Sequence, residues 1–415
     1  MRALKFSRYL PRFGWTPSVL TADPSCYPAD LLDPELEEEA RGIEVRRIFY
    51  PGAWRILNRK APPQPPAALS AAVRKGPGLR ARLRNFALAT EELPWALRAI
   101  VALRASDTRP DAIVTMSPPG WAHLIGDYAR RRLRVPWVMD FRDRWSGSPA
   151  HPPPAPWRQI EARAESRFLA TADRVLVATP ALEAHYRRLR PEARISTITN
   201  GYDAEDFANL RPSPAETFTV SHVGTLGGSR SPEPFLRAWR AFLVEGQIDL
   251  ESVACRFVGP TSRIDFEAAL ASDPPLRDSV TFRPFCSHRA ALQEMVDASV
   301  LLLLLPDQVE AGELLTGKAF EYMAAGRPIL ALAPEGALAD LLRANGAAAV
   351  VAPGDQAGLV AALRRLHERH RAGDMASTPV TLPDPGFERS RLTERLARIL
   401  DELILPARSR DAVED

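Results

Sequence analysis

The C-terminal half of the chain alternates short apolar segments with amphipathic ones, and this alternation constrains the fold more than any other feature. Residues 300–305 form a continuous apolar run within an expected strand at 299–305, as is typical of a strand buried on both faces of a sheet. Two other candidate strands, residues 218–224 and 253–259, each end in glycine, and helical spacing follows the first at 232–243. Strands that alternate with helices of this length predict a parallel, doubly wound α/β sheet.

The remaining candidate elements continue this pattern through both halves of the chain. In the C-terminal half we expect strands at 280–285, 328–333 and 347–351, and helices at 287–296, 318–325, 336–345 and 389–403. In the N-terminal half we expect a helix at 3–10 and strands at 17–21, 43–47, 112–116, 137–140, 175–178 and 195–199.

The chain is long enough for two domains. A single hydrophobic core seldom grows beyond about 250–300 residues, and this chain has 415. Pro212 and Pro214 interrupt the pattern among small polar residues at 206–217, so we place the boundary there. The predicted units are a first domain at 1–207, a second at 208–385, and a C-terminal helix and tail at 386–415, for which packing on the first domain is one possibility.

The first domain departs from the usual order at its start. A doubly wound domain normally opens with a central strand and a glycine-rich turn before its first helix. Here the helix expected at 3–10 comes first. We therefore expect either that this domain lacks its first strand or that the true start lies upstream.

Charge and cysteine content narrow the functional classes. The formal net charge is only +3, whereas nucleic-acid-binding domains concentrate basic residues on one face, so no nucleic-acid partner is expected. Cys26, Cys255 and Cys286 lack C-x-x-C spacing, which argues against a disulfide framework or zinc site and favours a reducing compartment. A signal peptide and a membrane-spanning apolar run are not found in the sequence. We expect a cytoplasmic protein.

Residues 50–94 are rich in proline, arginine and alanine and interrupt the first half. We expect a helix within this stretch at 79–90. A basic amphipathic helix there could contact anionic lipid at the inner membrane surface. A solvated helix on a long insertion is the alternative that the pattern alone favours.

The strongest functional signal is Glu313-Leu-Leu-Thr-Gly-Lys-Ala-Phe-Glu321, in which seven residues separate two glutamates. Thr316, Gly317 and Lys318 lie where a loop becomes a helix. Backbone N–H groups at such a helix start point outward, and the helix dipole favours an anion there. A diphosphate leaving group needs donors already in place, and Lys318 can add a charge-assisted contact.

The two glutamates suit the hydroxyl groups of sugars. Glu321, one turn inside the helix, can accept hydrogen bonds from both hydroxyls of a ribose, and Glu313 can reach the hydroxyls of a transferred sugar. Exposed glutamates on an ordinary helix capped by Thr316 are the alternative. The position of the pair, after a buried strand and before Ala-Ala-Gly-Arg-Pro-Ile-Leu, favours the functional interpretation.

These residues resemble the glycosyltransferase family 4 enzymes of bacterial glycan assembly, which have the two-domain GT-B fold. The acidic pair is similar to that family's EX7E motif, and the resemblance centres on TGKAFEYMAAGRPILA at 316–331. The other similar segments are TNGYDAEDF at 199–207 (the family's NGxDxxxF), VGTLGGSRSPE at 223–233 (the start of its donor domain) and PWVMDFRDRW at 136–145 (the DFRDxW segment of one bacterial branch).

The resemblance implies retaining transfer of a hexosyl-type sugar from a nucleotide-sugar to a glycan or lipid-linked acceptor, as in polysaccharide and cell-envelope biosynthesis. In that family the leaving phosphate helps to deprotonate the acceptor, so no protein nucleophile, metal or cofactor is expected beyond the nucleotide-sugar substrate. The seven histidines show neither HxxxH nor HExxH spacing.

Three residues are implied in catalysis: Glu313 at the donor sugar, and Lys318 and Arg230 at the diphosphate. The residues implied in binding the rest of the donor are Glu321, at the ribose, together with Gly224, Thr225, Thr316 and Gly317.

The acceptor is expected at the carboxyl ends of the first domain's strands. Asp140, Arg142 and Asp143 follow a strand there, and charged residues at this edge often lie in the ligand crevice. A structural salt bridge between Arg142 and one of the two carboxylates is equally well supported. Ser117 lies in the segment where many relatives carry a histidine, and His123 nearby is expected inside the next helix.

Two alternatives share this architecture. A nucleotide-sugar epimerase would need further acid/base carboxylates and histidines, and its motifs are not found. A non-catalytic or truncated nucleotide-sugar-binding protein would be compatible with a missing first strand.

Overall fold

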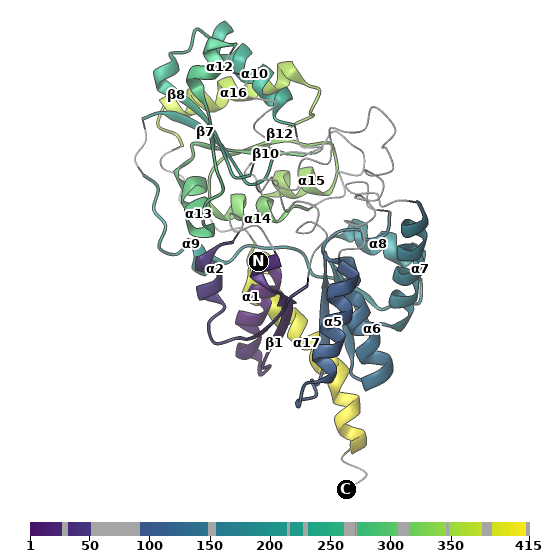
Figure 1. Cartoon of the computed structure of the whole chain (residues 1–415). Helices are drawn as coiled ribbons and strands as arrows, with labels where there is room; N and C mark the ends of the chain where they lie inside the picture. The colour runs from purple at the N-terminus through teal and green to yellow at the C-terminus, as the bar shows by residue number, and fades with distance from the viewer. Residues whose placement is uncertain are drawn as a thin grey trace.

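The computed structural model describes residues 1–26, 32–50, 92–147, 155–213, 216–226, 231–260, 270, 272–305, 315–345, 348–375 and 384–411. Two α/β lobes lie one above the other, and the N-terminal segment and the C-terminal helix both belong to the lower lobe (Figure 1). The helix predicted at 79–90 lies outside the described residues.

The second domain is built on a six-stranded parallel sheet. Its strands are β7 (Phe218–Val223), β8 (Val253–Val258), β9 (Val280–Arg283), β10 (Val300–Leu304), β11 (Ile329–Leu332) and β12 (Ala348–Val351). They follow the order β12-β11-β10-β7-β8-β9, so the order reverses between β7 and β10. The doubly wound fold predicted from the strand–helix alternation is therefore confirmed, and its ligand crevice is expected at this switch point.

Helices cover both faces of this sheet, which explains the continuous apolar run of β10. Leu302 and Leu304 pack into the core on one face, and Leu301 and Leu303 into the core on the other. Full burial of each leucine contributes roughly 1.5–3 kcal/mol. The first face is covered by α10 (Glu233–Glu245), α12 (Pro274–Ser279) and α16 (Gln356–Arg371), and the second by α13 (His288–Asp297), α14 (Gly317–Ala324) and α15 (Ala337–Ala344).

The strands of the first domain form two parallel sheets. One pairs β1 (Ser18–Ala22) with β2 (Glu44–Ile48). The other has the order β3 (Ile113–Ser117), β4 (Trp137–Phe141), β5 (Arg174–Val177), β6 (Ile195–Thr197). Among the described residues α1 (Arg2–Tyr9) precedes every strand, as predicted.

Helices join these two sheets into one domain. α5 (Glu92–Arg104) contacts both β2 and α6 (His123–Tyr128), the helix that follows β3. The apolar cluster beneath α5 includes Trp95, Trp121 and Tyr50. The other α-helices among the described residues of this domain are α2 (Pro34–Glu39), α7 (Ala155–Thr171), α8 (Pro180–Leu189) and α9 (Ala204–Phe207).

The chain crosses between the domains twice, and the two crossings are tied together. Tyr202, on the way out of the first domain, forms a parallel β-bridge with Glu388, on the way back. α17 (Arg389–Asp411) then lies along α1 (Figure 1), where Leu392 and Leu396 pack with Phe6. Among the described helices, including α17, none is both long and apolar enough to cross a lipid bilayer.

Candidate functional site

The candidate site lies where the strand order of the second domain reverses. β7 ends at Val223, and Gly224 follows with a φ of 129°. The N–H of Gly224 donates to the carbonyl of Val258 at 2.6 Å. Thr316 caps α14, because its side chain accepts a hydrogen bond from the N–H of Lys318 at 3.3 Å. The sharp turn after β7 and the amide end of α14 thus meet at the switch point.

Gly224 and Lys318 are packed against each other. A Cβ atom on Gly224 would fall far inside van der Waals contact of Cε and Nζ of Lys318, and a positive φ also disfavours any other residue there. By contrast, a Cβ atom on Gly317 would enter open space. Glycine at 224 therefore allows the lysine side chain to lie across the end of β7.

His222 holds the ammonium group of Lys318 in this position. The imidazole is buried, with Nδ1 2.9 Å from the carbonyl oxygen of Leu302 and Nε2 3.4 Å from Nζ of Lys318. Because a carbonyl oxygen only accepts, Nδ1 must donate, and this leaves Nε2 to accept from the ammonium. His222 was not predicted as a site residue, although a histidine two residues before the glycine that follows a buried strand is a signal that could have identified it.

Tyr322 joins α14 to the end of β7. Its hydroxyl accepts from the N–H of Val223 at 2.8 Å and lies 3.4 Å from the carbonyl oxygen of Leu302. Complete burial raises the pKa of the Tyr322 hydroxyl, which stays neutral. Tyr322, which was also not predicted as a site residue, fixes α14, the helix that carries Lys318, to the end of β7.

Glu321 is half-buried on the same helix. The pKa of His288 is raised: burial lowers it, but the Asp206 hydrogen bond and the charge of Glu321 outweigh that effect. The charge of Glu321 also acts on Arg389 at the start of α17. The donor-side residues that the structure describes, Gly224, Thr225, Thr316, Gly317, Lys318 and Glu321, lie on two segments that meet at Gly224 and Lys318. Glu313 and Arg230 lie outside the described residues.

The predicted acceptor-side residues lie at the carboxyl ends of β3 and β4. Asp140 is completely buried within β4, and Arg2 binds its carboxylate with Nε at 2.7 Å and Nη2 at 3.0 Å. The salt bridge considered for Arg142 is thus formed by Arg2, because α1 places its first side chain against β4. Arg142 donates from Nε to the carbonyl of Ser117 at 3.3 Å, and Asp143 is exposed. Contact of these residues with an acceptor stays a prediction.

His123 is buried inside the first domain. Its Nδ1 lies 2.8 Å from Oγ1 of Thr115, and complete burial lowers its pKa to about 3. The imidazole is therefore neutral and belongs to the core.

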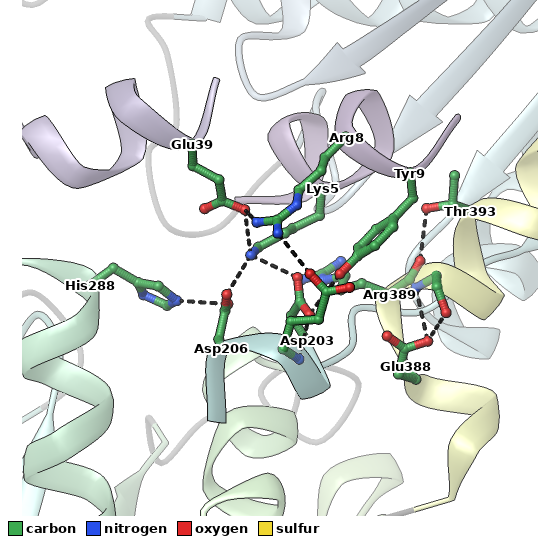
Figure 2. A network of polar contacts seen from close by, with 12 residues as sticks. Lys5, Arg8, Tyr9, Glu39, Asp203, Asp206, His288, Glu388, Arg389 and Thr393 are labelled. Atoms are coloured by element: carbon green, nitrogen blue, oxygen red, sulfur yellow. Dashed lines mark hydrogen bonds and ion pairs between the residues drawn. The ribbon is translucent and has the colours of Figure 1, made fainter. Parts of the chain in front are cut away.

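A buried ionic network connects the first domain with the chain crossing (Figure 2). Nζ of Lys5, with the side chain only 1% exposed, lies 2.7 Å from Asp203, 2.7 Å from Asp206 and 2.6 Å from Glu39. Tyr9 donates to Asp203 at 2.9 Å. Burial alone lowers the pKa of Lys5, and the carboxylates, Asp203 first, raise it above its usual value.

This network also reaches the second domain. Asp206 lies 3.3 Å from Nε2 of His288 on α13, and Asp33 accepts from the backbone N–H of His288 at 2.7 Å. The carboxylates of Glu39, Asp203 and Asp206 are close enough together to hold a metal ion. The ammonium of Lys5 already lies among them and supplies the positive charge. This cluster links the two domains through Asp206 and Asp33, and its partners are too far apart in sequence to be predicted.

Two family models match the chain. One, described as a glycosyl transferase 4-like domain, matches residues 1–201, and one for glycosyl transferases group 1 matches residues 217–369. No curated protein matches the sequence.

Solved structures share the fold at low sequence identity. Sucrose-phosphate synthase from Thermosynechococcus elongatus has a TM-score of 0.62 at 16% identity, covering 96% of this chain and 92% of its own. A trehalose-phosphate synthase from Burkholderia xenovorans, solved with glucose-6-phosphate, has a TM-score of 0.55 at 13% sequence identity, and the match covers 79% of each chain. TarM of S. aureus, solved with UDP among its ligands, has a TM-score of 0.54 at 11% sequence identity, and the match covers 74% of this chain and 59% of TarM. These likenesses show a shared GT-B architecture.

Proposed function

We propose that this chain, which belongs to the family 4 glycosyltransferases, moves a hexosyl-type sugar from a nucleotide-sugar to a glycan or lipid-linked acceptor with retention of configuration. The observation that supports this most is the placement of Lys318 across Gly224, at the amide end of α14 and one turn before Glu321. Positive charge, backbone donors and a carboxylate then lie at the strand switch point, where such sheets bind ligands.

In this proposal the departing diphosphate lies against Lys318 and the start of α14. The N–H groups of the first turn and the helix dipole meet the negative charge that develops on the leaving oxygen. His222 keeps the ammonium in place before the substrate arrives, because Nε2 accepts from it at 3.4 Å. Arg230 would add a second cation at the same group.

Glu321 and Glu313 would hold the two sugars of the donor. Glu321, one turn after Lys318 on α14, would accept hydrogen bonds from the ribose hydroxyls, while Glu313 would contact the transferred sugar. UDP in the TarM structure and the UDP-forming reaction named for the Burkholderia protein support a nucleotide donor, without identifying the base used here.

Retention would follow from reaction on one face of the sugar. The bond between the anomeric carbon and the diphosphate oxygen breaks, the acceptor oxygen bonds to the same face, and the acceptor's proton passes to the phosphate. The positive charge required comes from Lys318, Arg230 and the helix, without a metal or cofactor. We place this reaction in cell-envelope glycan synthesis in the cytoplasm, at or near the inner membrane surface.

The decisive experiment screens nucleotide-sugars by thermal shift and then assays transfer with the best stabilising donor. We expect one donor class to stabilise the wild-type chain and Lys318→Ala to remove most of that effect. Arg364→Gln, on the exposed side of α16, is the matched control and should behave as wild type. Stabilisation that persists in Lys318→Ala would contradict the site, and binding without turnover would favour a non-catalytic binder.

A further inference from the structure

The loop at residues 142–147, which follows β4, carries charged residues at the edge where the proposed acceptor would bind. Arg142 and Asp143 begin this loop at the carboxyl end of the strand, and ligands of such sheets lie beyond that edge. Arg142 is held by the backbone of the neighbouring strand, because its N–H and its Nε both donate to the carbonyl of Ser117 at 3.3 Å. The second half of the loop is held by side chains instead.

Glu165 on α7 holds this second half. Its side chain is 1% exposed and accepts hydrogen bonds from two residues. Ser146 donates from its backbone N–H at 3.3 Å and also from its hydroxyl, and the hydroxyl of Tyr186 donates at 3.0 Å. Burial raises the pKa of the Glu165 carboxyl, and the hydrogen bonds from Ser146 and Tyr186 oppose that shift. A single carboxyl group therefore receives both donors of a loop residue.

Tyr186 on α8 joins the same contacts to the strand. Its ring stacks on Phe141, the last residue of β4, with the ring centroids 4.4 Å apart. Its hydroxyl accepts from the N–H of Trp145 at 3.4 Å while it donates to Glu165. The end of β4, the loop and two helices are thus connected through one buried set of polar contacts.

Trp145 connects the loop to the segment that follows β3. A Cβ atom on Gly120, just after β3, would fall on the indole ring of Trp145. Trp121 contacts this indole edge-to-face at 5.4 Å between ring centroids, and Phe168 of α7 stacks on it at 5.9 Å. The two segments that leave the carboxyl ends of β3 and β4 are therefore packed together.

Stability alone does not account for a carboxyl group at position 165. No cation pairs with Glu165 among the described residues, and burying a carboxyl group is unfavourable unless its hydrogen bonds are made. Apolar replacement of buried ionic groups is often neutral or stabilising. A satisfied buried polar network instead favours one conformation of the groups that it joins. The gain from Glu165 is a defined loop conformation.

We propose that Glu165 is a positioning residue for the acceptor, and that it fixes the loop at 142–147 so that Arg142 and Asp143 are in place before the acceptor binds. This inference rests on the proposed function, which supplies the acceptor. Glu165 would not contact the substrate, because its carboxyl group is buried and bound by Ser146 and Tyr186. Buried partners of this kind give binding groups the precision that transfer requires.

The first test is limited proteolysis, which needs no activity. Trypsin cleaves after arginine, and the loop contains Arg142 and Arg144. We expect Glu165→Leu to be cleaved at these two sites roughly ten-fold faster than wild type, because the loop opens locally more often. Its thermal unfolding midpoint should stay near that of wild type. Gln159→Leu, which places the same residue on the exposed side of α7, is the matched control and should be cleaved as wild type.

Tyr186→Phe provides an independent variant should Glu165→Leu fold poorly. It keeps the ring that stacks on Phe141 and removes only the hydroxyl that binds Glu165 and Trp145. Faster cleavage confined to the loop is the expected result. A lower unfolding midpoint with faster cleavage throughout the chain would show a purely structural role for the network.

The second test measures transfer kinetics with a panel of octyl glycosides as acceptor probes. Glu165→Leu should raise the acceptor KM about ten-fold or more and leave the donor KM unchanged, because the proposed donor residues lie in the second domain. Glu165→Gln should recover part of this loss, since its amide oxygen still accepts a hydrogen bond. A purely structural role predicts a lower kcat with both KM values unchanged.

The two tests separate failure of this inference from failure of the proposed function. A wild-type chain that binds no nucleotide-sugar would count against the proposed function, whereas the cleavage comparison would still decide whether Glu165 fixes the loop. Equal cleavage of wild type, Glu165→Leu and Tyr186→Phe would overturn the inference even if transfer is observed. An unchanged acceptor KM in Glu165→Leu would also overturn it.

Discussion

Nζ of Lys318 lies 3.4 Å from Nε2 of His222, an imidazole whose other nitrogen is 2.9 Å from the carbonyl oxygen of Leu302. This contact connects α14, β7 and β10 at the point where the sheet changes direction. The histidine is buried and its tautomer is set by the backbone, so it positions the lysine without contacting the proposed substrate.

Lys318 and His222 should therefore behave as one unit. We expect Lys318→Ala to slow transfer about ten-fold or more, because it removes charge from the leaving group. His222→Leu should lower kcat by a smaller factor. The double variant should be little worse than Lys318→Ala alone, as expected for coupled residues. Fully additive losses in steady-state rates would show that the two act separately.

The two glutamates should affect different kinetic parameters. Glu321→Ala should weaken donor binding, because the ribose hydroxyls lose an acceptor. Glu313→Ala should lower turnover more than affinity, because it acts at the reacting sugar. Calorimetric titration with the donor and initial-rate measurements separate these effects, and unchanged values for both variants would remove the site assignment.

Gly224 and Gly317 offer a steric comparison. Gly224→Ala should displace Lys318 and weaken donor binding, because the added methyl collides with Cε and Nζ. Gly317→Ala should leave the unfolding midpoint nearly unchanged, because its methyl enters open space. If that space is where the diphosphate lies, Gly317→Ala should nevertheless weaken donor binding. Normal donor affinity in Gly224→Ala would contradict the close approach.

Lys5 should be a major determinant of stability. Lys5→Met leaves Asp203, Asp206 and Glu39 without their shared cation, and loss of one partner from a buried ionic group costs about 3–5 kcal/mol. Arg12→Met removes an exposed arginine that pairs with Glu205 and should cost roughly 0–1 kcal/mol. Chemical unfolding of both variants measures the difference, and equal losses would show that burial of the network is unimportant.

The contact between His288 and Asp206 should make stability depend on pH. The folded-state pKa of His288 is raised above the ordinary value of about 6.5. Burial lowers this pKa, but the hydrogen bond to Asp206 and the charge of Glu321 raise it by more, while the charge of Lys5 lowers it. Its contribution is therefore complete below the unfolded pKa and is lost as pH rises through the folded pKa. Unfolding midpoints measured from about pH 6 to 8 should fall more for wild type than for His288→Gln. Parallel pH profiles would refute the assignment.

Sequence patterns predicted the parts of the fold that depend on local periodicity. The continuous apolar run at 300–305 corresponds to β10, which is buried on both faces, and the glycine-ended segment at 218–224 corresponds to β7. The start of α14 at Gly317 agrees with the helix predicted from 318. These elements can be predicted from the sequence because burial imposes a pattern of apolar residues on neighbouring positions.

Contacts between distant residues were beyond such patterns. Arg2 and Asp140 are 138 positions apart. The sequence supported equally a salt bridge of Arg142 with Asp140 or Asp143 and a role of these residues in acceptor binding, and it gave no indication of Arg2. The carboxylates around Lys5 and the imidazole beneath Lys318 likewise come together only when whole elements pack. Charged residues that meet in this way carry no periodic signal.

The β-bridge between Tyr202 and Glu388 joins the two interdomain crossings to each other. A single flexible linker would allow the second domain to translate and rotate freely relative to the first. Two paired crossings would allow rotation of one domain relative to the other but would restrict translation. Rotation of that kind would move Glu321 toward or away from the start of α1 when the two domains change their relative orientation. Deleting α17 should consequently disable the lower lobe and this rotation together, because α17 packs on α1 and follows the bridge directly.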